Sequence, residues 1–208
     1  MNKQVVITRM LYAENDPKFE ERLAIYRALC LPRIKNQTVK TDIAVLCNEA
    51  HAETFRSLGV IPFFMRDGSI GHKPGRFWSC LTKWDNIKGL DKYDLQINID
   101  SDDLMTDNYV WRINKAIEME EEQSLHIHFQ PRVFNLHTLE EKEQNKKYNT
   151  KEGSAFYALY QPNKENYVYI GQTSHLLMPS LMDKSVLIGE GYCWIGIHDG
   201  NDSTTMQC

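Results

Sequence analysis

The chain has 208 residues, 42% hydrophobic and 25% charged, which indicates a globular protein and excludes a disordered one. Its formal net charge of −4 gives no general attraction to nucleic acid or an anionic membrane, although it does not exclude a local basic groove. No apolar stretch approaches the ~20 residues that span a bilayer, and no secretory signal opens the chain, so we expect a soluble, cytoplasmic protein (in the host cytoplasm if viral).

Apolar runs alternate with helical patterns in the first half of the chain. Asp16 and Pro17 are suited to begin a helix, and Pro32 is expected to end it near Leu31. Gly59 is expected to end a second helix. The predicted strands are 5–7, 43–46 and 60–65, and the predicted helices are 17–31 and 50–58. This alternation predicts a parallel sheet with helices on its faces.

A strand at 95–99 follows a glycine-rich loop at 66–75 and a helix at 79–90. It alternates apolar and polar residues, so a central position in the sheet would require hydrogen-bond partners for Gln96 and Asn98. A helix is predicted from about Asp107, with Thr106 as its cap.

The second half is predicted to continue the same domain. Residues 125–134 indicate either two short strands or one strand broken at Pro131, and 139–153 indicate a mobile loop or a solvated helix. Further strand-like segments are 156–160, 167–170 and 192–197. We predict a single α/β domain with one half at about 1–105, a second half at about 106–208 and a mobile loop at about 137–153.

The acidic segment after the strand at 95–99 carries the main functional signal. In an extended segment Asp100 and Asp102 point the same way, and ligands bind beyond the carboxyl ends of strands in open α/β sheets. Carboxylates are the ligands that Mg²⁺ and Mn²⁺ prefer, and such a cation stabilises a diphosphate leaving group. Asp103 is best explained as a supporting group or a helix-start charge.

Several short segments, in order along most of the chain, resemble the GT-A glycosyltransferases and within them the rhamnosyltransferase group. The matching segments are Ile7-Thr8-Arg9, Phe19-Glu20-Glu21-Arg22-Leu23, Leu31-Pro32, Asn36-Gln37-Thr38, Asn98-Ile99-Asp100-Ser101-Asp102-Asp103 and His198-Asp199-Gly200-Asn201. The resemblance implies a GT-A-like, Rossmann-like fold with a mixed, mainly parallel sheet flanked by helices. One departure is the alternating strand before Asp100, which is smoother and more apolar in the group.

The resemblance also implies roles for individual residues. Asp100, Asp102 and His198 would hold Mn²⁺ or Mg²⁺, with Asp102 as the main metal carboxylate. The predicted donor-binding residues are Thr8, Arg9, Arg76, Lys83, Asp100 and Ser101. The donor would be a nucleoside diphosphate sugar, bound by the half at about 1–105, and the half at about 106–208 would form the acceptor side.

Glu190 is the predicted catalytic base of an inverting transfer, in which a carboxylate removes the proton of the acceptor hydroxyl. It lies between Gly189 and Gly191, which allow close approach of the backbone. A solvated turn glutamate is an equally good interpretation, and a retaining enzyme would need no such base.

Other residues favour structural roles. His126 and His128 share one face of a strand, but without a third ligand nearby a hydrogen-bonded or solvated sheet face is favoured over zinc. Cys30, Cys47 and Cys193 lie in apolar runs and are predicted to be reduced core thiols, whereas Cys208 has no predicted role. Trp111 and Trp194 are predicted to be core residues.

The acceptor of the leading hypothesis stays open between a surface glycan, a lipid-linked sugar and a hydroxylated DNA base. A DNA acceptor would require a basic groove, for which the lysines within 142–151 are a weak, glutamate-diluted sign. One alternative is a nucleotidyltransferase acting on sugar phosphates, although residues 9–15 lack the glycine-rich phosphate loop. Another is a catalytically silent sugar-binding domain. The oligomeric state is not determined.

Overall fold

A computed structural model describes residues 3–65, 89–120, 123–136, 138, 140–142, 156–163, 167–170 and 178–197. The predicted loop at 66–75, most of the predicted helix at 79–90 and most of the predicted mobile loop lie outside these residues. Among the described residues, no helix combines the length and apolar character needed to cross a membrane.

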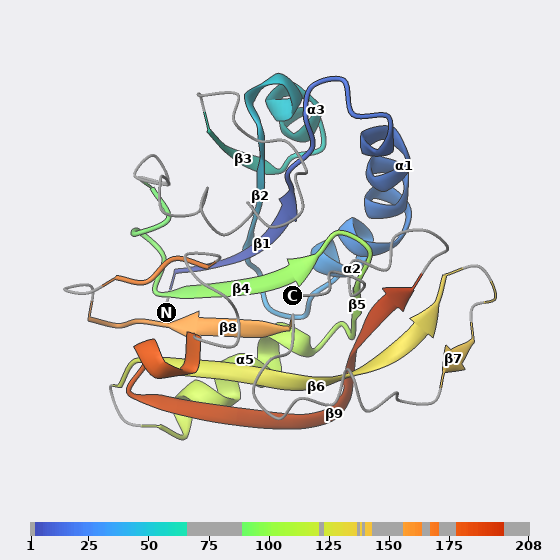
Figure 1. Ribbon diagram of the computed structural model, residues 1–208. Helices are drawn as coiled ribbons and strands as arrows, with labels where there is room; N and C mark the ends of the chain where they lie inside the picture. The colour runs from blue at the N-terminus through green and yellow to red at the C-terminus, as the bar shows by residue number, and fades with distance from the viewer. Residues whose placement is uncertain are drawn as a thin grey trace.

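The first half forms the parallel part of the sheet, as the alternation of strands and helices predicts. Its strands are β1 (Gln4–Met10), β2 (Asp42–Asn48), β3 (Ile61–Met65) and β4 (Leu95–Asp100). They are all parallel and lie in the order β3-β2-β1-β4 (Figure 1). The carboxyl ends of β1 and β4 therefore meet at one edge of the sheet.

The second half continues the same sheet with mixed strand directions. Its strands are β5 (Leu104–Met105), β6 (Leu125–Asn135), β7 (Glu141–Lys142), β8 (Tyr157–Tyr160) and β9 (Lys184–Ile197). The order continues from β4 through β8, β6 and β9 to β5, while β7 pairs with the outer end of β6. Only the β6–β9 pair is parallel in this half. The predicted mixed α/β fold is confirmed.

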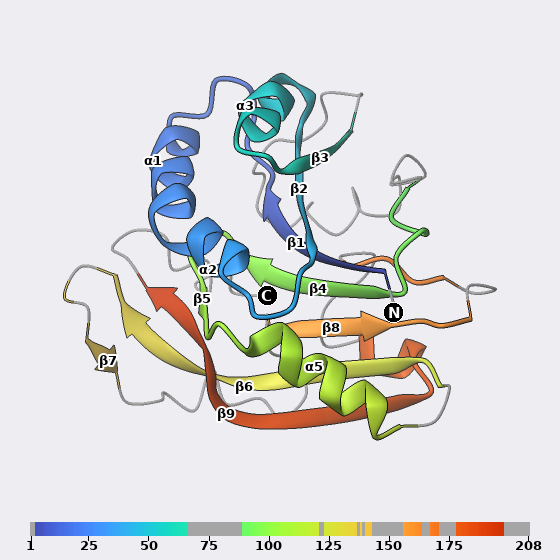
Figure 2. The ribbon, with the colours of Figure 1, turned by 180° about the vertical axis from the view of Figure 1, so that it is seen from behind.

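The helices lie mainly on one face of the sheet. Figure 2 shows α2 (Leu31–Lys35) and α5 (Tyr109–Glu118) in front of the strands, with α1 (Lys18–Ile25) to the left of β1 and α3 (Ala52–Ser57) beside β2 and β3. Short 3₁₀ helices occupy Glu49–His51 and Met178–Leu181. The larger hydrophobic core packs between these helices and side chains such as Val6, Ile97 and Ile127. The other face packs Val5 and Ile7 against a second cluster.

The first helix does not end before Pro32, which corrects the sequence-based prediction. A π-helical turn at Tyr26–Cys30 joins α1 to α2, and the Leu31 N–H donates to the carbonyl of Tyr26, five residues earlier. Proline lacks an N–H and its ring crowds the carbonyl four residues before it. The wider π turn immediately before Pro32 relieves this conflict, so the helical path continues to Lys35.

The cap of α5 also differs from the prediction. The helix begins at Tyr109, and Thr106 Oγ1 donates to the Asn108 side chain instead of capping the helix. The Val110 N–H is satisfied by Gln37 Oε1 at 2.9 Å, and Gln37 Nε2 donates to the carbonyl of Thr106. The cap therefore comes from Gln37, which lies just beyond the end of α2. Val110, Ile113 and Ile117 form the buried stripe of α5.

Three further predictions need correction. Residues 125–134 lie in one strand that passes through Pro131 with shifts of register around Gln130. The segment 167–170 is not a strand and ends in a turn at Ile170. Trp111 is 39% exposed and Trp194 is half-buried, so neither belongs to the core. In contrast, Cys30, Cys47 and Cys193 are buried free thiols, as predicted.

The central position of β4 between β1 and β8 raises the question of its polar residues. Gln96 is fully buried, donates to the Val168 carbonyl at 2.9 Å and accepts from the Ile170 N–H at 3.1 Å. Gln161 also accepts from Val168 N–H, at 2.6 Å. Glutamine side chains thus take the place of a paired strand for the segment 167–170.

We expect Gln96→Leu to lower the free energy of unfolding by about 2–3 kcal/mol, because it leaves a buried backbone N–H without its partner. For a chain of this size the midpoint of thermal unfolding should fall by roughly 5–10 °C. Thermal unfolding followed by circular dichroism measures the effect. An unchanged midpoint would show that water replaces the amide without cost.

Candidate functional site

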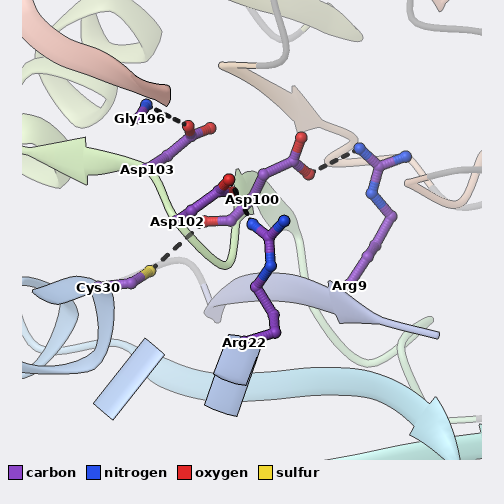
Figure 3. Close-up of polar contacts among 7 residues, drawn as sticks. All are labelled: Arg9, Arg22, Cys30, Asp100, Asp102, Asp103 and Gly196. Atoms are coloured by element: carbon purple, nitrogen blue, oxygen red, sulfur yellow. Dashed lines mark hydrogen bonds and ion pairs between the residues drawn. The ribbon is translucent and has the colours of Figure 1, made fainter. Parts of the chain in front are cut away.

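The four residues that follow the core of β4, Asp100-Ser101-Asp102-Asp103, form an acidic turn at the carboxyl edge of the sheet. The turn is closed by the Asp103 N–H, which donates to the Asp100 carbonyl at 3.2 Å. The three carboxylates point in different directions: those of Asp100 and Asp102 face arginine side chains, whereas that of Asp103 points to Gly196 (Figure 3). Each carboxylate therefore has a distinct environment.

Asp100 is paired with Arg9. The two residues are directly opposite each other in the parallel pairing of β1 and β4, so both side chains emerge on the same face. Arg9 donates to Asp100 Oδ1 at 2.7 Å, and the side chains are 18% and 36% exposed. Burial disfavours the charged form of Arg9, but Asp100, with smaller contributions from Tyr157 and Asp103, outweighs burial and the pKa of the guanidinium is raised. Asp100 remains the more accessible of the two aspartates of the Asp-x-Asp pair.

Asp102 is paired with Arg22, which comes from α1. This ion pair is more buried, with side chains 9% and 14% exposed. Arg22 also hydrogen-bonds the hydroxyl of Tyr12, a buried residue of the loop between β1 and α1. The guanidinium thus links that loop to the acidic turn.

Asp103 is almost fully buried and has a supporting position. Its Oδ1 accepts from the Gly196 N–H at 3.2 Å, while Oδ2 has no hydrogen-bond partner among the described residues. Burial, followed by the nearby charges of Asp102 and Asp100, raises the pKa of the Asp103 carboxyl well above its usual value. Its contact ties the turn to β9, which agrees with the interpretation of Asp103 as a supporting group.

The end of β9 packs directly against the acidic turn. β9 pairs with β5, the short strand that follows the turn, through Trp194 and Cys193. A Cβ added to Gly196 would overlap the backbone carbonyl oxygen of Asp102 and lie 3.2 Å from Leu136 Cδ1. Only glycine permits this approach without displacing the backbone of Asp102.

The π turn supports the acidic turn from the helical side. Cys30, at its end, lies with Sγ 3.5 Å from the Asp100 carbonyl, and burial raises the pKa of its thiol well above the usual value. Thr8 is fully buried next to Tyr26 and Cys30, and Ser101 is also buried. The predicted contacts of Thr8 and Ser101 with a donor stay predictions.

Several predicted site residues lie outside the described residues, namely Arg76, Lys83 and His198. The described chain ends at Ile197, immediately after the contact of Gly196 with the acidic turn. Glu190 has a described backbone but not a described side chain. It lies in β9 opposite Gln130, where the register shifts, and Gly189 and Gly191 both have positive φ (27° and 88°). The predicted base is therefore on a strand irregularity and not in a loop, and its role stays a prediction.

Arg22 and Gly196 are the residues that sequence reasoning missed. Arg22 was part of a matched segment, but its position on a helix gave no sign of a partner some 80 positions away. Gly196 lay within an apolar run, and an isolated glycine in a strand is a signal of close backbone approach.

The histidine pair of β6 is buried. His126 and His128 are buried, with ring centroids 5.2 Å apart, and His126 Nδ1 lies 3.0 Å from Ser185 Oγ. Within the described part of the chain, no group of three histidine, cysteine, aspartate or glutamate side chains is arranged to hold a metal ion. The contact of His126 with Ser185 is of the kind expected for a hydrogen-bonded sheet face.

Comparison with known structures identifies the fold. A structure of S. aureus TarS residues 1–349 in complex with UDP-GlcNAc matches with a TM-score of 0.59 and 10% identity, covering 98% of this chain and 61% of that one. The complex of the same TarS segment with UDP matches with a TM-score of 0.53 and 10% identity, covering 94% of this chain and 60% of that one. The chain therefore spans less than two thirds of the length of these structures, and it has a GT-A-like fold. No protein-family model and no curated protein sequence matches it.

Proposed function

We propose that this chain is a metal-dependent glycosyltransferase that uses a nucleoside diphosphate sugar. The observation that carries the proposal is the acidic turn at the carboxyl end of β4, where Asp100 and Asp102 face two arginines in a GT-A-like fold. The resemblance of the fold to TarS bound to UDP-GlcNAc supports the donor class. The sugar, including the rhamnose that the sequence resemblance suggests, and the choice among glycan, lipid-linked sugar and modified DNA as acceptor stay open.

The residues of the turn are chemically suited to a hard divalent cation. Two aspartates, Asp100 and Asp102, offer oxygen ligands, and Mg²⁺ or Mn²⁺ typically takes its remaining ligands from phosphates and water. His198 follows Ile197 directly in the sequence and is the third ligand that the resemblance suggests. A bound cation would stabilise the negative charge that develops on the diphosphate.

The residues of this chain would carry out the remaining steps of the transfer. Arg9, near the end of β1, would bind the diphosphate, and Arg76 and Lys83 would bind the diphosphate or the sugar. In an inverting reaction the acceptor oxygen forms a bond to the anomeric carbon while the bond from that carbon to the diphosphate oxygen breaks. Glu190 would take the hydroxyl proton, and the nucleoside diphosphate would leave with the bonding electron pair.

Ligand binding tests the proposal directly. UDP, GDP and TDP and their sugars are titrated into the protein by calorimetry, with Mn²⁺ and with a chelator. Metal-dependent binding of one diphosphate series supports the glycosyltransferase. A preference for nucleoside triphosphates would favour a nucleotidyltransferase, and sugar binding without nucleotide binding would favour a silent sugar-binding domain.

Glu190→Gln separates the base from the donor site. We expect the variant to bind donor like the wild type but to lose roughly 10²–10⁴-fold in kcat, because the amide cannot accept the proton. Parallel measurement of donor affinity and single-turnover transfer checks both effects. A variant with near-normal kcat would remove Glu190 from the mechanism. A product with the same anomeric configuration as the donor would show that the enzyme is retaining and needs no such base.

A further inference from the structure

The two ion pairs of the acidic turn carry opposite charges in equal number. Asp100 and Asp102 together contribute two negative charges, and Arg9 and Arg22 two positive charges. A donor diphosphate and a divalent cation also carry charges of opposite sign and similar size. The net charge of the site therefore changes little if both ligands bind together, but it changes strongly if only one of them binds.

The pair between Arg22 and Asp102 is the more sensitive of the two. It is more buried than the pair between Arg9 and Asp100, and a buried ion that loses its partner is strongly destabilising. A cation that binds Asp102 alone would leave the Arg22 guanidinium without a carboxylate. A diphosphate that attracts Arg22 alone would take from the buried Asp102 carboxylate its ion pair with Arg22.

Arg22 also has a second contact that keeps it in the site. The Tyr12 hydroxyl is a neutral hydrogen-bond partner of the guanidinium, on the loop between β1 and α1. Release of Asp102 therefore need not release Arg22 to solvent. The guanidinium fork is suited to bind phosphate oxygens as well as carboxylate oxygens.

We propose that Arg22 exchanges partners, from Asp102 to the diphosphate, when donor and cation bind together, so that each ligand binds tightly only in the presence of the other. This inference rests on the proposed function. It makes Arg22 a diphosphate-binding residue and also a competitor of the cation for Asp102. Removal of the arginine should therefore affect the two ligands in opposite directions.

The test compares wild type with Arg22→Gln, using Mn²⁺ alone, nucleoside diphosphate alone in a chelator, and both together. The diphosphate is whichever of UDP, GDP and TDP the wild type binds most tightly. In the wild type we expect each ligand to increase the affinity of the protein for the other by roughly 50-fold or more. In Arg22→Gln, Mn²⁺ alone should bind about 10-fold more tightly, the diphosphate alone about 10-fold more weakly, and their mutual effect should fall below about 5-fold.

The matched control is Arg33→Gln. Arg33 lies in the continuation of the same helical segment and pairs with Asp107 at 3.5 Å, with both side chains half exposed. This variant should bind both ligands like the wild type. Mn²⁺ should also raise the unfolding temperature of Arg22→Gln more than that of the wild type, because the cation supplies the missing counter-charge of Asp102.

If Arg22→Gln binds both Mn²⁺ and nucleoside diphosphate more weakly, and to the same extent, Arg22 only maintains the shape of the turn. Unchanged affinities would show that Arg22 has no part in binding. Either result overturns the exchange but leaves the proposed function standing, provided that the wild type binds nucleotide in a metal-dependent way. If the wild type does not, the proposed function fails and the exchange fails with it. Should Arg22→Gln not fold, Arg22→Lys is expected to show the same signs with changes of about 2–3-fold, because a lysine makes a weaker pair.

Discussion

Replacing Asp102 with asparagine is expected to lower kcat by roughly 10³-fold and to abolish the dependence of donor binding on Mn²⁺. The amide keeps the shape of the side chain and still offers an oxygen to Arg22, but it lacks the negative charge that a divalent cation requires. Turnover at saturating donor and calorimetric titration of nucleoside diphosphate with and without Mn²⁺ measure the two effects.

Asp102→Ala should show the same functional loss together with a lower free energy of unfolding. Removal of the carboxylate leaves the buried Arg22 guanidinium without its partner, which costs about 3–5 kcal/mol. The asparagine variant keeps a hydrogen-bond acceptor for Arg22 and should lose less stability than the alanine variant, so comparison of the two separates the functional loss from the loss of stability. Asp107→Asn is the matched control, because Asp107 pairs with Arg33 on the surface. This variant should retain full activity. Turnover at the wild-type rate in a folded Asp102→Asn variant would exclude Asp102 as the main metal ligand.

Gly196→Ala is expected to reduce kcat/KM by roughly 10²-fold, because small displacements of positioned groups have effects of this size. The added methyl group would overlap the Asp102 carbonyl, so the end of β9 and the acidic turn must separate. The hydrogen bond from Gly196 to Asp103 Oδ1 lengthens as a result. The overlap should also lower the free energy of unfolding by about 1–3 kcal/mol.

Gly59→Ala distinguishes loss of stability from loss of activity. Gly59 has φ 73° and nothing near its missing Cβ, so alanine there causes backbone strain of about 1–2 kcal/mol far from the acidic turn. We expect Gly59→Ala to lose about as much free energy of unfolding as Gly196→Ala. It should nevertheless be fully active at a temperature at which both variants are folded. Steady-state kinetics and thermal unfolding of the two variants make the comparison. Wild-type activity in Gly196→Ala would show that the position of the turn does not depend on β9.

Local patterns in the sequence predicted the parallel half of the fold. The apolar runs of β1 and β2 and the acidic segment after β4 are continuous in the chain, so periodicity and strand–helix alternation reveal them. Arg9 and Asp100 were both predicted to bind the donor, and the parallel pairing of β1 and β4 places them opposite each other. The sequence also raised the problem of Gln96, whose partners in the segment 167–170 the structure supplies.

Tertiary contacts decided what the local patterns could not. The helix was expected to stop at Pro32, but packing against the sheet stabilises the continued helix and a π turn absorbs the conflict. Gln37 caps α5 across 73 positions, and Gly196 holds Asp103 across 93. Residues this distant leave no periodic signal at either end.

The sequence by itself determined that acidic side chains stand at the carboxyl end of a central strand, because strand periodicity and the position of the turn are local properties. Only the tertiary structure decided that Asp102 faces Arg22 and that Gly196 supports the turn. The physical reason is that these contacts depend on how helices and strands pack across the sheet, and packing brings together residues whose separation in the chain carries no information about their distance in space.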